Sequence, residues 1–172
     1  MELIRKVIHL SGLMYIPAYK LFGRKFVAFA VGFLTALAIV LDVLRRRYNI
    51  IPEFLLRDYE KKGIGAFVYF GVAALLMTLT LPKDACYVGI GVGCLGDSVA
   101  GIVKHRFRKP EYAPICMFIS SILFLHVLGL PTLPSFFGVV AGVLLEGSSF
   151  LNDNFTIPIA SSTIFFLSEI VL

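Results

Sequence analysis

The sequence predicts an all-α integral membrane protein, a single-domain bundle of about seven transmembrane helices. Of its 172 residues, 58% are hydrophobic and 16% are charged, and the mean hydropathy is +0.88, which is too apolar for an ordinary soluble domain. One crossing of about 20 residues with a loop of roughly 5 gives about seven crossings in this length. Because no separate soluble domain fits, we treat residues 1–172 as one transmembrane domain whose helices and short loops carry any chemistry.

Seven apolar runs are the candidate spans. In chain order they are Val7–Phe22, Phe26–Leu44, Ile64–Leu81, Ala85–Val103, Pro114–Leu130, Leu133–Leu145 and Phe155–Leu172. The first contains His9 and Lys20 and the sixth is short, so six spans with a re-entrant segment are the alternative. The one long connection, 45–63, contains Pro52 at a position typical of a helix start, which predicts a short helix on the membrane surface.

Basic residues are distributed unevenly between the two faces of this predicted bundle. Twelve of the 16 Lys and Arg residues fall on the face that holds the N-terminus, and the other four are Lys20, Arg24, Lys25 and Lys83. Because Lys and Arg are enriched in cytoplasmic loops, this asymmetry predicts a cytoplasmic N-terminus. The formal net charge of +5 is then an orientation signal and a contact to anionic lipid, and we expect no nucleic-acid partner.

Three acidic residues fall on the same predicted cytoplasmic face. Asp97 lies inside the fourth span, Glu146 ends the sixth and Asp153 precedes the seventh. A carboxylate in hydrocarbon needs a cation, a metal or water beside it, so the structural interpretation of Asp97 is a salt bridge to a nearby Lys or Arg. The functional interpretation is a nucleotide site, in which carboxylates bind Mg²⁺ and basic residues bind a polyphosphate.

Glycines and a histidine add further candidates. Gly89 and Gly93 have the spacing of small residues that favours close helix packing, and their face also offers a surface for a homodimer. A broken helix with amides facing an anion is the alternative for this stretch. His9, one turn after Arg5, is either satisfied by a neighbour or acts as a phosphate contact or proton relay.

Three motifs are spread over nearly the whole chain. They are Arg5-Lys6-x-x-His9-x-x-Gly12, Gly96-Asp97-x-x-Ala100, and Glu146 followed by Asp153-Asn154-Phe155-Thr156-Ile157-Pro158. In this order they resemble the CTP-dependent lipid-alcohol kinases, which comprise dolichol and polyprenol kinases, phytol kinase and the CTP-dependent diacylglycerol kinase. The sequence departs from the family at Arg108-Lys109-Pro110-Glu111-Tyr112-Ala113-Pro114, where the family commonly carries a Lys-Ser-x-Glu-Gly stretch.

The resemblance implies transfer of the γ-phosphoryl group of CTP to the hydroxyl of a membrane lipid alcohol, polyprenol-like or diacylglycerol-like, with Mg²⁺ as cofactor. The implied catalytic residues are Asp97, Asp153, Glu146 and His9, and the three carboxylates are also the candidate metal ligands. The candidate nucleotide-binding residues are Arg5, Lys6, Gly96 and Asn154 from the motifs, with Arg46 and Lys104 from location alone. The sequence assigns neither the base among the carboxylates nor the lipid acceptor.

The composition leaves other functions open. A cytidylyltransferase acting on a lipid phosphate needs the same metal and basic groups, and it differs by releasing pyrophosphate instead of CDP. A small transporter would place polar groups at the midplane or on a path through both faces. A non-catalytic membrane scaffold would bind no nucleotide, and it leaves the gathering of three carboxylates unexplained.

Overall fold

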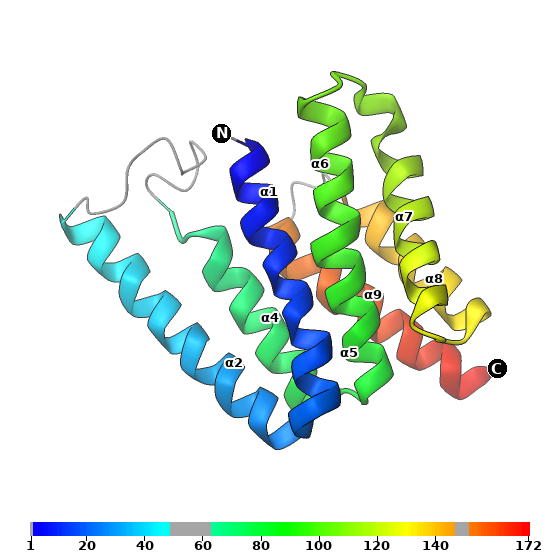
Figure 1. Cartoon of the computed structure of the whole chain (residues 1–172), viewed down its shortest axis with the longest axis horizontal. Helices are drawn as coiled ribbons and strands as arrows, with labels where there is room; N and C mark the ends of the chain where they lie inside the picture. Colours follow the sequence, from blue (N-terminus) through cyan, green and yellow to red (C-terminus); the bar gives the residue numbers. More distant parts are fainter. Residues whose placement is uncertain (1, 49–62, 147–151) are drawn as a thin grey trace.

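The computed structural model describes residues 2–48, 63–146 and 152–172. Within these ranges the chain is all-helical and contains no strand, as predicted from the apolar runs. The helices pack side by side in a bundle (Figure 1). The surface helix predicted near Pro52 lies outside the described residues.

The N-terminal third of the chain folds as a bent helix. It comprises α1 (Glu2–Leu10), the short η1 (Ser11–Met14) and α2 (Tyr15–Tyr48). Gly23 makes the bend, with φ 76° and ψ 177°, a conformation that glycine adopts without steric cost. The two limbs form a V with α4 (Ala66–Thr80) between them (Figure 1). At the bend, Arg24 donates to the carbonyls of Thr78 (2.7 Å) and Leu79 (2.5 Å), which would otherwise be orphan acceptors at the end of α4.

A central helix follows. It consists of α5 (Lys83–Ile90), a π-helical turn η3 (Gly91–Gly96) and α6 (Asp97–His105). The glycines before Asp97 allow close packing on the last helix: a Cβ on Gly93 would lie 2.7 Å from Cγ of Pro158. Close helix packing is therefore the correct interpretation of the Gly89/Gly93 spacing. The prediction that Gly89 and Gly93 offer a surface for a homodimer is wrong, because both glycines are buried within one copy of the chain.

Three further helices complete the bundle. They are α7 (Ala113–Val127), preceded by the short η4 (Pro110–Tyr112), then α8 (Thr132–Leu145) and α9 (Asp153–Val171). The last two helices approach closely at glycines: a Cβ on Gly138 would lie 2.8 Å from the carbonyl oxygen of Ser161. Small residues allow such close approach where lipid tails provide no hydrophobic drive for helix association.

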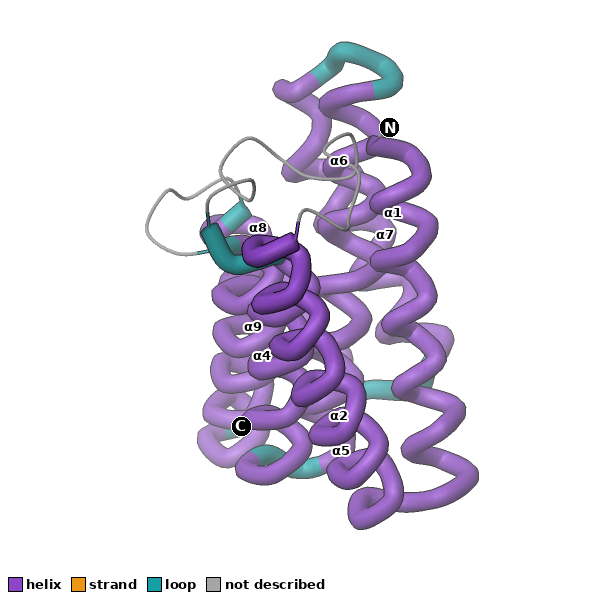
Figure 2. Tube along the Cα trace, turned by 90° about the vertical axis from the view of Figure 1, so that its left-hand side faces the viewer, coloured by secondary structure: helices purple, strands orange, loops and turns teal. Residues whose placement is uncertain are grey.

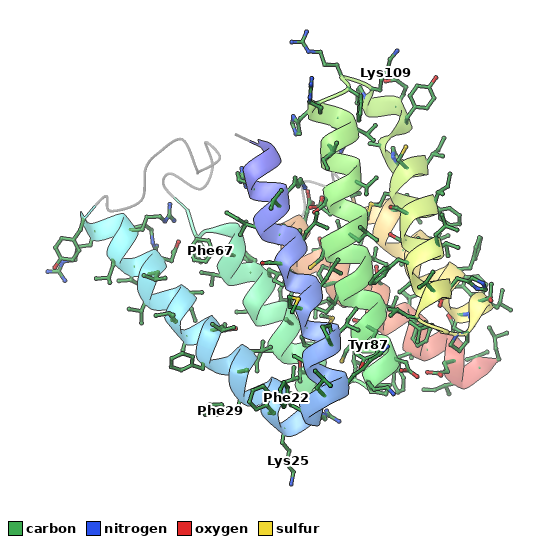
Figure 3. The ribbon with its side chains drawn as sticks, viewed as in Figure 1. Phe22, Lys25, Phe29, Phe67, Tyr87 and Lys109 are labelled. Atoms are coloured by element: carbon green, nitrogen blue, oxygen red, sulfur yellow. The ribbon has the colours of Figure 1, made fainter. Side chains whose placement is uncertain are left out.

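Among the described residues, four helices are long and apolar enough to cross a membrane, namely Arg5–Tyr48, Lys83–His105, Pro110–Val127 and Asp153–Val171. Two apolar helices, α4 and α8, are shorter. Large apolar side chains face outward from α2, where Phe22 is 60% exposed and Phe29, on the outer side of the helix, is 76% exposed (Figure 3). This apolar exterior is compatible with a lipid bilayer.

The N-terminus and C-terminus lie toward opposite ends of the bundle (Figure 2). The end that holds the N-terminus also holds the last residues of α2 and α6 and the first residues of α4 and α7 (Figure 1). We call it the N-terminal end of the bundle. The polar side chains singled out from the sequence lie on α1, α2, α6 and α9, and Glu146 directly follows α8.

Candidate functional site

A partly buried ion pair between α1 and α6 forms the centre of the candidate site. Nζ of Lys6 donates to Oδ2 of Asp97 at 2.6 Å and to the main-chain oxygen of Asp97 at 3.0 Å. Lys6 is 5% exposed, and the Asp97 side chain is 15% exposed. The cation expected beside Asp97 is therefore Lys6, which lies 91 residues away in the sequence.

His9 lies beside this ion pair and contacts the same central helix. Its Nε2 is 2.7 Å from the carbonyl oxygen of Gly93 and 3.8 Å from Oδ2 of Asp97. Because a carbonyl can only accept, Nε2 carries the hydrogen in this contact and is not available there as a proton acceptor. The ring also meets Phe70 of α4 edge-on, with 5.1 Å between the centroids. We call Lys6, His9, Gly93 and Asp97 the Asp97 cluster.

Two small residues of α6 contact Lys6, and sequence reasoning found neither. Oγ of the buried Ser98 donates to the main-chain oxygen of Lys6 at 3.5 Å. Gly101 lies under the Lys6 side chain, where a Cβ would stand 2.7 Å from Nζ. The signal for Gly101 in the sequence is its spacing of four residues from Asp97, which places both on one face of the helix.

Lys104 and Glu146 form a second pair at the N-terminal end of the bundle. Nζ of Lys104 donates to Oε1 of Glu146 at 2.5 Å, which ties the last turn of α6 to the end of α8. The Glu146 side chain is buried and that of Lys104 is partly exposed. Because Lys104 follows Asp97 by about two helical turns, roughly 10 Å, this pair is separate from the Asp97 cluster.

The third motif begins α9. Asn152 caps this helix, because its Oδ1 accepts from the backbone N of Asn154 and from Nδ2 of Asn154, both at 3.0 Å. Asp153 lies in the first turn, where the helix dipole favours a negative charge. The structure thus gives Asn154 a local partner, and its proposed contact with a nucleotide stays a prediction.

Arg46 lies at the end of α2, on the other side of α4 from α1 (Figure 1). Its Nε is 3.1 Å from Oδ2 of Asp42. Oδ1 of Asp42 accepts from Nε and Nη2 of Arg45 at 3.1 and 2.6 Å and from the backbone N of Gly65 at 3.0 Å. Arg45 also donates to the carbonyl of Gly63 at 2.8 Å. We call Asp42, Arg45, Arg46, Gly63 and Gly65 the Asp42 cluster.

The remaining predicted positions have simpler surroundings. Arg5 is partly buried and precedes Lys6 on α1. Gly96 is buried against α7, where a Cβ would lie 3.1 Å from Cγ of Met117, so close packing accounts for this glycine. The stretch from Arg108 to Tyr112 lies between α6 and α7. Lys109 lies at the outer tip of this stretch (Figure 3).

Mg²⁺ was expected at three carboxylates. Within the part of the chain that the structure describes, no group of three or more His, Cys, Asp or Glu side chains could hold a metal ion. Asp97 contacts Lys6, Glu146 contacts Lys104, and Asp153 lies in the first turn of α9. These residues therefore do not fit a three-carboxylate metal site, and we derive no step through a protein-bound metal.

No protein-family model, curated protein or solved structure matches the chain. The geometry of the Asp97 cluster and the three sequence motifs are therefore the basis for a functional proposal. Both converge on Lys6, His9 and Asp97, which belong to the first two motifs and lie in contact.

Proposed function

We propose that the protein is a membrane-embedded lipid kinase that transfers the γ-phosphoryl group of CTP to the hydroxyl of a lipid alcohol, polyprenol-like or diacylglycerol-like. The observation that carries the proposal is the partly buried contact of Lys6 with Asp97, with His9 beside it, inside a bundle of apolar helices. Ionisable groups held inside a membrane bundle are costly and usually functional. The order of the three motifs supports the same activity.

In the proposed reaction, the lipid hydroxyl gives its proton to the Asp97 carboxylate while its oxygen attacks the γ-phosphorus. A bond between this oxygen and the γ-phosphorus forms, the bridging bond to the β-phosphate breaks, and CDP leaves. The Lys6 ammonium neutralises charge on the phosphoryl oxygens, and the proton passes from Asp97 to solvent. Phosphoryl transfer requires mainly positioning and charge neutralisation, which two or three fixed side chains can provide.

His9 has a positioning role in this scheme, and Mg²⁺ belongs to the triphosphate. Because Nε2 of His9 donates to the carbonyl of Gly93, the ring ties α1 to the π-helical turn next to Asp97. Mg²⁺ bound to the triphosphate would offset part of its negative charge. No step above depends on a metal held by the protein.

We further propose seven spans with a cytoplasmic N-terminus. In this topology the bent helix Arg5–Tyr48 supplies two spans, the shorter α4 and α8 supply two, and the other three long helices supply three. The termini lie toward opposite ends of the bundle, as an odd number of crossings requires (Figure 2). CTP would then reach the N-terminal end of the bundle from the cytoplasm, and the lipid alcohol would enter laterally from the bilayer.

The proposal is tested with an acceptor panel. Purified protein in lipid nanodiscs receives CTP or ATP together with a polyprenol, phytol or diacylglycerol, and the products are identified by mass spectrometry. We expect a monophosphorylated lipid and CDP from at least one acceptor with CTP. Release of pyrophosphate with a CDP-lipid would establish a cytidylyltransferase instead, and the absence of any lipid product would reject both activities.

A further inference from the structure

Gly101 provides the space in which the Lys6 side chain crosses α6. A Cβ on Gly101 would lie 2.7 Å from Nζ of Lys6 and 3.3 Å from its Cδ, and closer still to its Cε. Nonbonded carbon atoms settle at about 3.5–4.0 Å, so any side chain at position 101 overlaps the path of the lysine. The backbone fixes the position of a Cβ at residue 101, and Gly101 is buried. The end of the Lys6 side chain would therefore have to move.

The place where the lysine ends explains why this space matters. Nζ lies against both Oδ2 and the main-chain oxygen of Asp97, at 2.6 and 3.0 Å. Asp97 precedes Gly101 by one helical turn, and the two residues share a face of α6. The Lys6 ammonium therefore lies between the two acceptor oxygens of Asp97 and the backbone of Gly101, which has no side chain.

We propose that Gly101 is a positioning residue, which sets the Lys6 ammonium on Asp97 by leaving room for the lysine stem. The overlapping atoms are the end of a flexible side chain, so an alanine at 101 displaces the ammonium and leaves the helix in place. The effect on catalysis rests on the proposed function. The role of Gly101 in placing Lys6 is independent of that function, because it follows from the contacts of α1 with α6.

The consequence for the proposed reaction is a loss of charge neutralisation. Gly101→Ala moves the Lys6 ammonium away from Asp97 and therefore from the phosphoryl oxygens that it would neutralise. Removing one preorganised electrostatic contact from a transition state lowers kcat by about 10²–10³-fold in measured cases. Because the lysine is displaced and not removed, we expect a fall of at least about tenfold in kcat.

The experiment compares five proteins: the wild type, Gly101→Ala, Lys6→Ala, the double variant, and Gly32→Ala as the matched control. Gly32 is also a helical glycine, but a Cβ there would meet only Cδ1 of Leu75 at an ordinary 3.7 Å. The first readout is the rate at which an amine-reactive acetylating ester modifies Lys6, followed on the Lys6 peptide by mass spectrometry. The second is the thermal unfolding midpoint, and the third is CTP-dependent turnover.

We expect Lys6 to be acetylated at least about tenfold faster in folded Gly101→Ala, the lower bound of the factor that corresponds to losing one charge-assisted hydrogen bond. In Gly32→Ala the rate should equal that of the wild type. A wild-type acetylation rate in folded Gly101→Ala overturns the proposal, whatever the activity. If the wild type shows no turnover but acetylation still changes as expected, the proposed function fails and the role of Gly101 in placing Lys6 stands.

The double variant covers the case in which Gly101→Ala does not fold. Truncating Lys6 to alanine removes all three overlapping atoms, so folding should return in the double variant; continued unfolding overturns the proposal. Where turnover is measurable, the double variant should be no slower than Lys6→Ala alone, because Gly101 acts only through Lys6. An additional loss from Gly101→Ala in the Lys6→Ala background also counts against the proposal.

Discussion

Two aspartates in the same bundle, one buried and one partly buried, have different surroundings. Asp42 contacts two arginines and a backbone amide, and its side chain is 2% exposed. Asp97 contacts Lys6, with His9 beside it, and its side chain is 15% exposed. The Asp42 cluster joins the ends of α2 and α4, whereas the Asp97 cluster joins α1 to the middle of the central helix.

The difference separates a structural ion pair from a candidate site. Arginine binds a carboxylate through a rigid planar fork, and here Arg45 holds Asp42 through two nitrogens. Lysine is a point charge on a flexible stem and can turn toward another anion, such as a phosphate. We infer that the Asp42 cluster fixes the fold, and that the Asp97 cluster carries the chemistry.

The largest expected effect is on stability, at Asp42. Asp42→Ala leaves the buried Arg45 without its carboxylate, and breaking a buried pair in this way costs about 3–5 kcal/mol. Chemical or thermal unfolding in detergent measures the loss. Asp84→Ala is the control, because its exposed pair with Lys83, at 3.8 Å, contributes less than about 1 kcal/mol. Equal stability of the two variants would contradict a structural role for the Asp42 cluster.

The next effect separates activity from stability at Asp97. Asp97→Asn keeps the shape of the side chain but removes the negative charge and the proton acceptor, so lipid kinase turnover should fall by at least about 10²-fold. Its unfolding midpoint should fall less than that of Asp42→Ala, because Lys6 keeps the main-chain oxygen of residue 97 as an acceptor and the asparagine still offers a side-chain oxygen. Turnover per folded molecule is measured beside Asp42→Asn, which should retain the wild-type value. If Asp42→Asn lost more turnover per folded molecule than Asp97→Asn, the chemistry would belong to Asp42 and not to Asp97.

A smaller effect is expected at His9. His9→Leu removes the donor to the carbonyl of Gly93 and should cost about 1 kcal/mol of stability, the usual net contribution of a hydrogen bond. His9→Gln retains an N–H donor and should recover most of that loss. Thermal unfolding of the two variants side by side shows whether the hydrogen bond to Gly93 accounts for the loss of stability. If Gln is as destabilising as Leu, the bond to Gly93 is not what holds the ring.

The smallest effect is expected at Arg46. Its side chain is 42% exposed and Arg45 remains on Asp42 when it is removed, so Arg46→Ala should cost less than about 1 kcal/mol. Because α4 separates Arg46 from α1, the KM for CTP should stay at the wild-type value (Figure 1). A severalfold rise in this KM would contradict this expectation and would support the nucleotide contact that was predicted for Arg46 from its location in the sequence.

Local sequence patterns predicted the helices well. The run Pro114–Leu130 corresponds to α7, Ala113–Val127, because a membrane span needs an unbroken stretch of apolar residues. The runs Val7–Phe22 and Phe26–Leu44 also predicted a break between two limbs, and the structure places it at Gly23. The pattern did not show that the helix continues on both sides of this one residue, because a single backbone conformation makes the bend. It also did not show that the central helix contains a π-helical turn next to Asp97.

The candidate site was only partly accessible from sequence. Asp97 was identified because an acid inside an apolar run is costly, but its partner Lys6 depends on the packing of α1 against α6. The role of Gly101 depends on the same contact, so its spacing of four residues from Asp97 gains meaning only once Lys6 is placed beside both residues. The Gly89/Gly93 spacing predicted a close contact correctly, yet only the fold shows that the partner is Pro158 of the same chain.

One measurement tests the central claim, phosphoryl transfer at Asp97, most directly. CTP radiolabelled at either the γ- or the α-phosphorus is incubated with the wild type or Asp97→Asn and the acceptor identified in the panel, and label in the lipid fraction is counted. We predict that the γ-label enters the lipid, that the α-label does not, and that Asp97→Asn abolishes the transfer. Entry of the α-label, or γ-transfer by Asp97→Asn at the wild-type rate, would contradict the account.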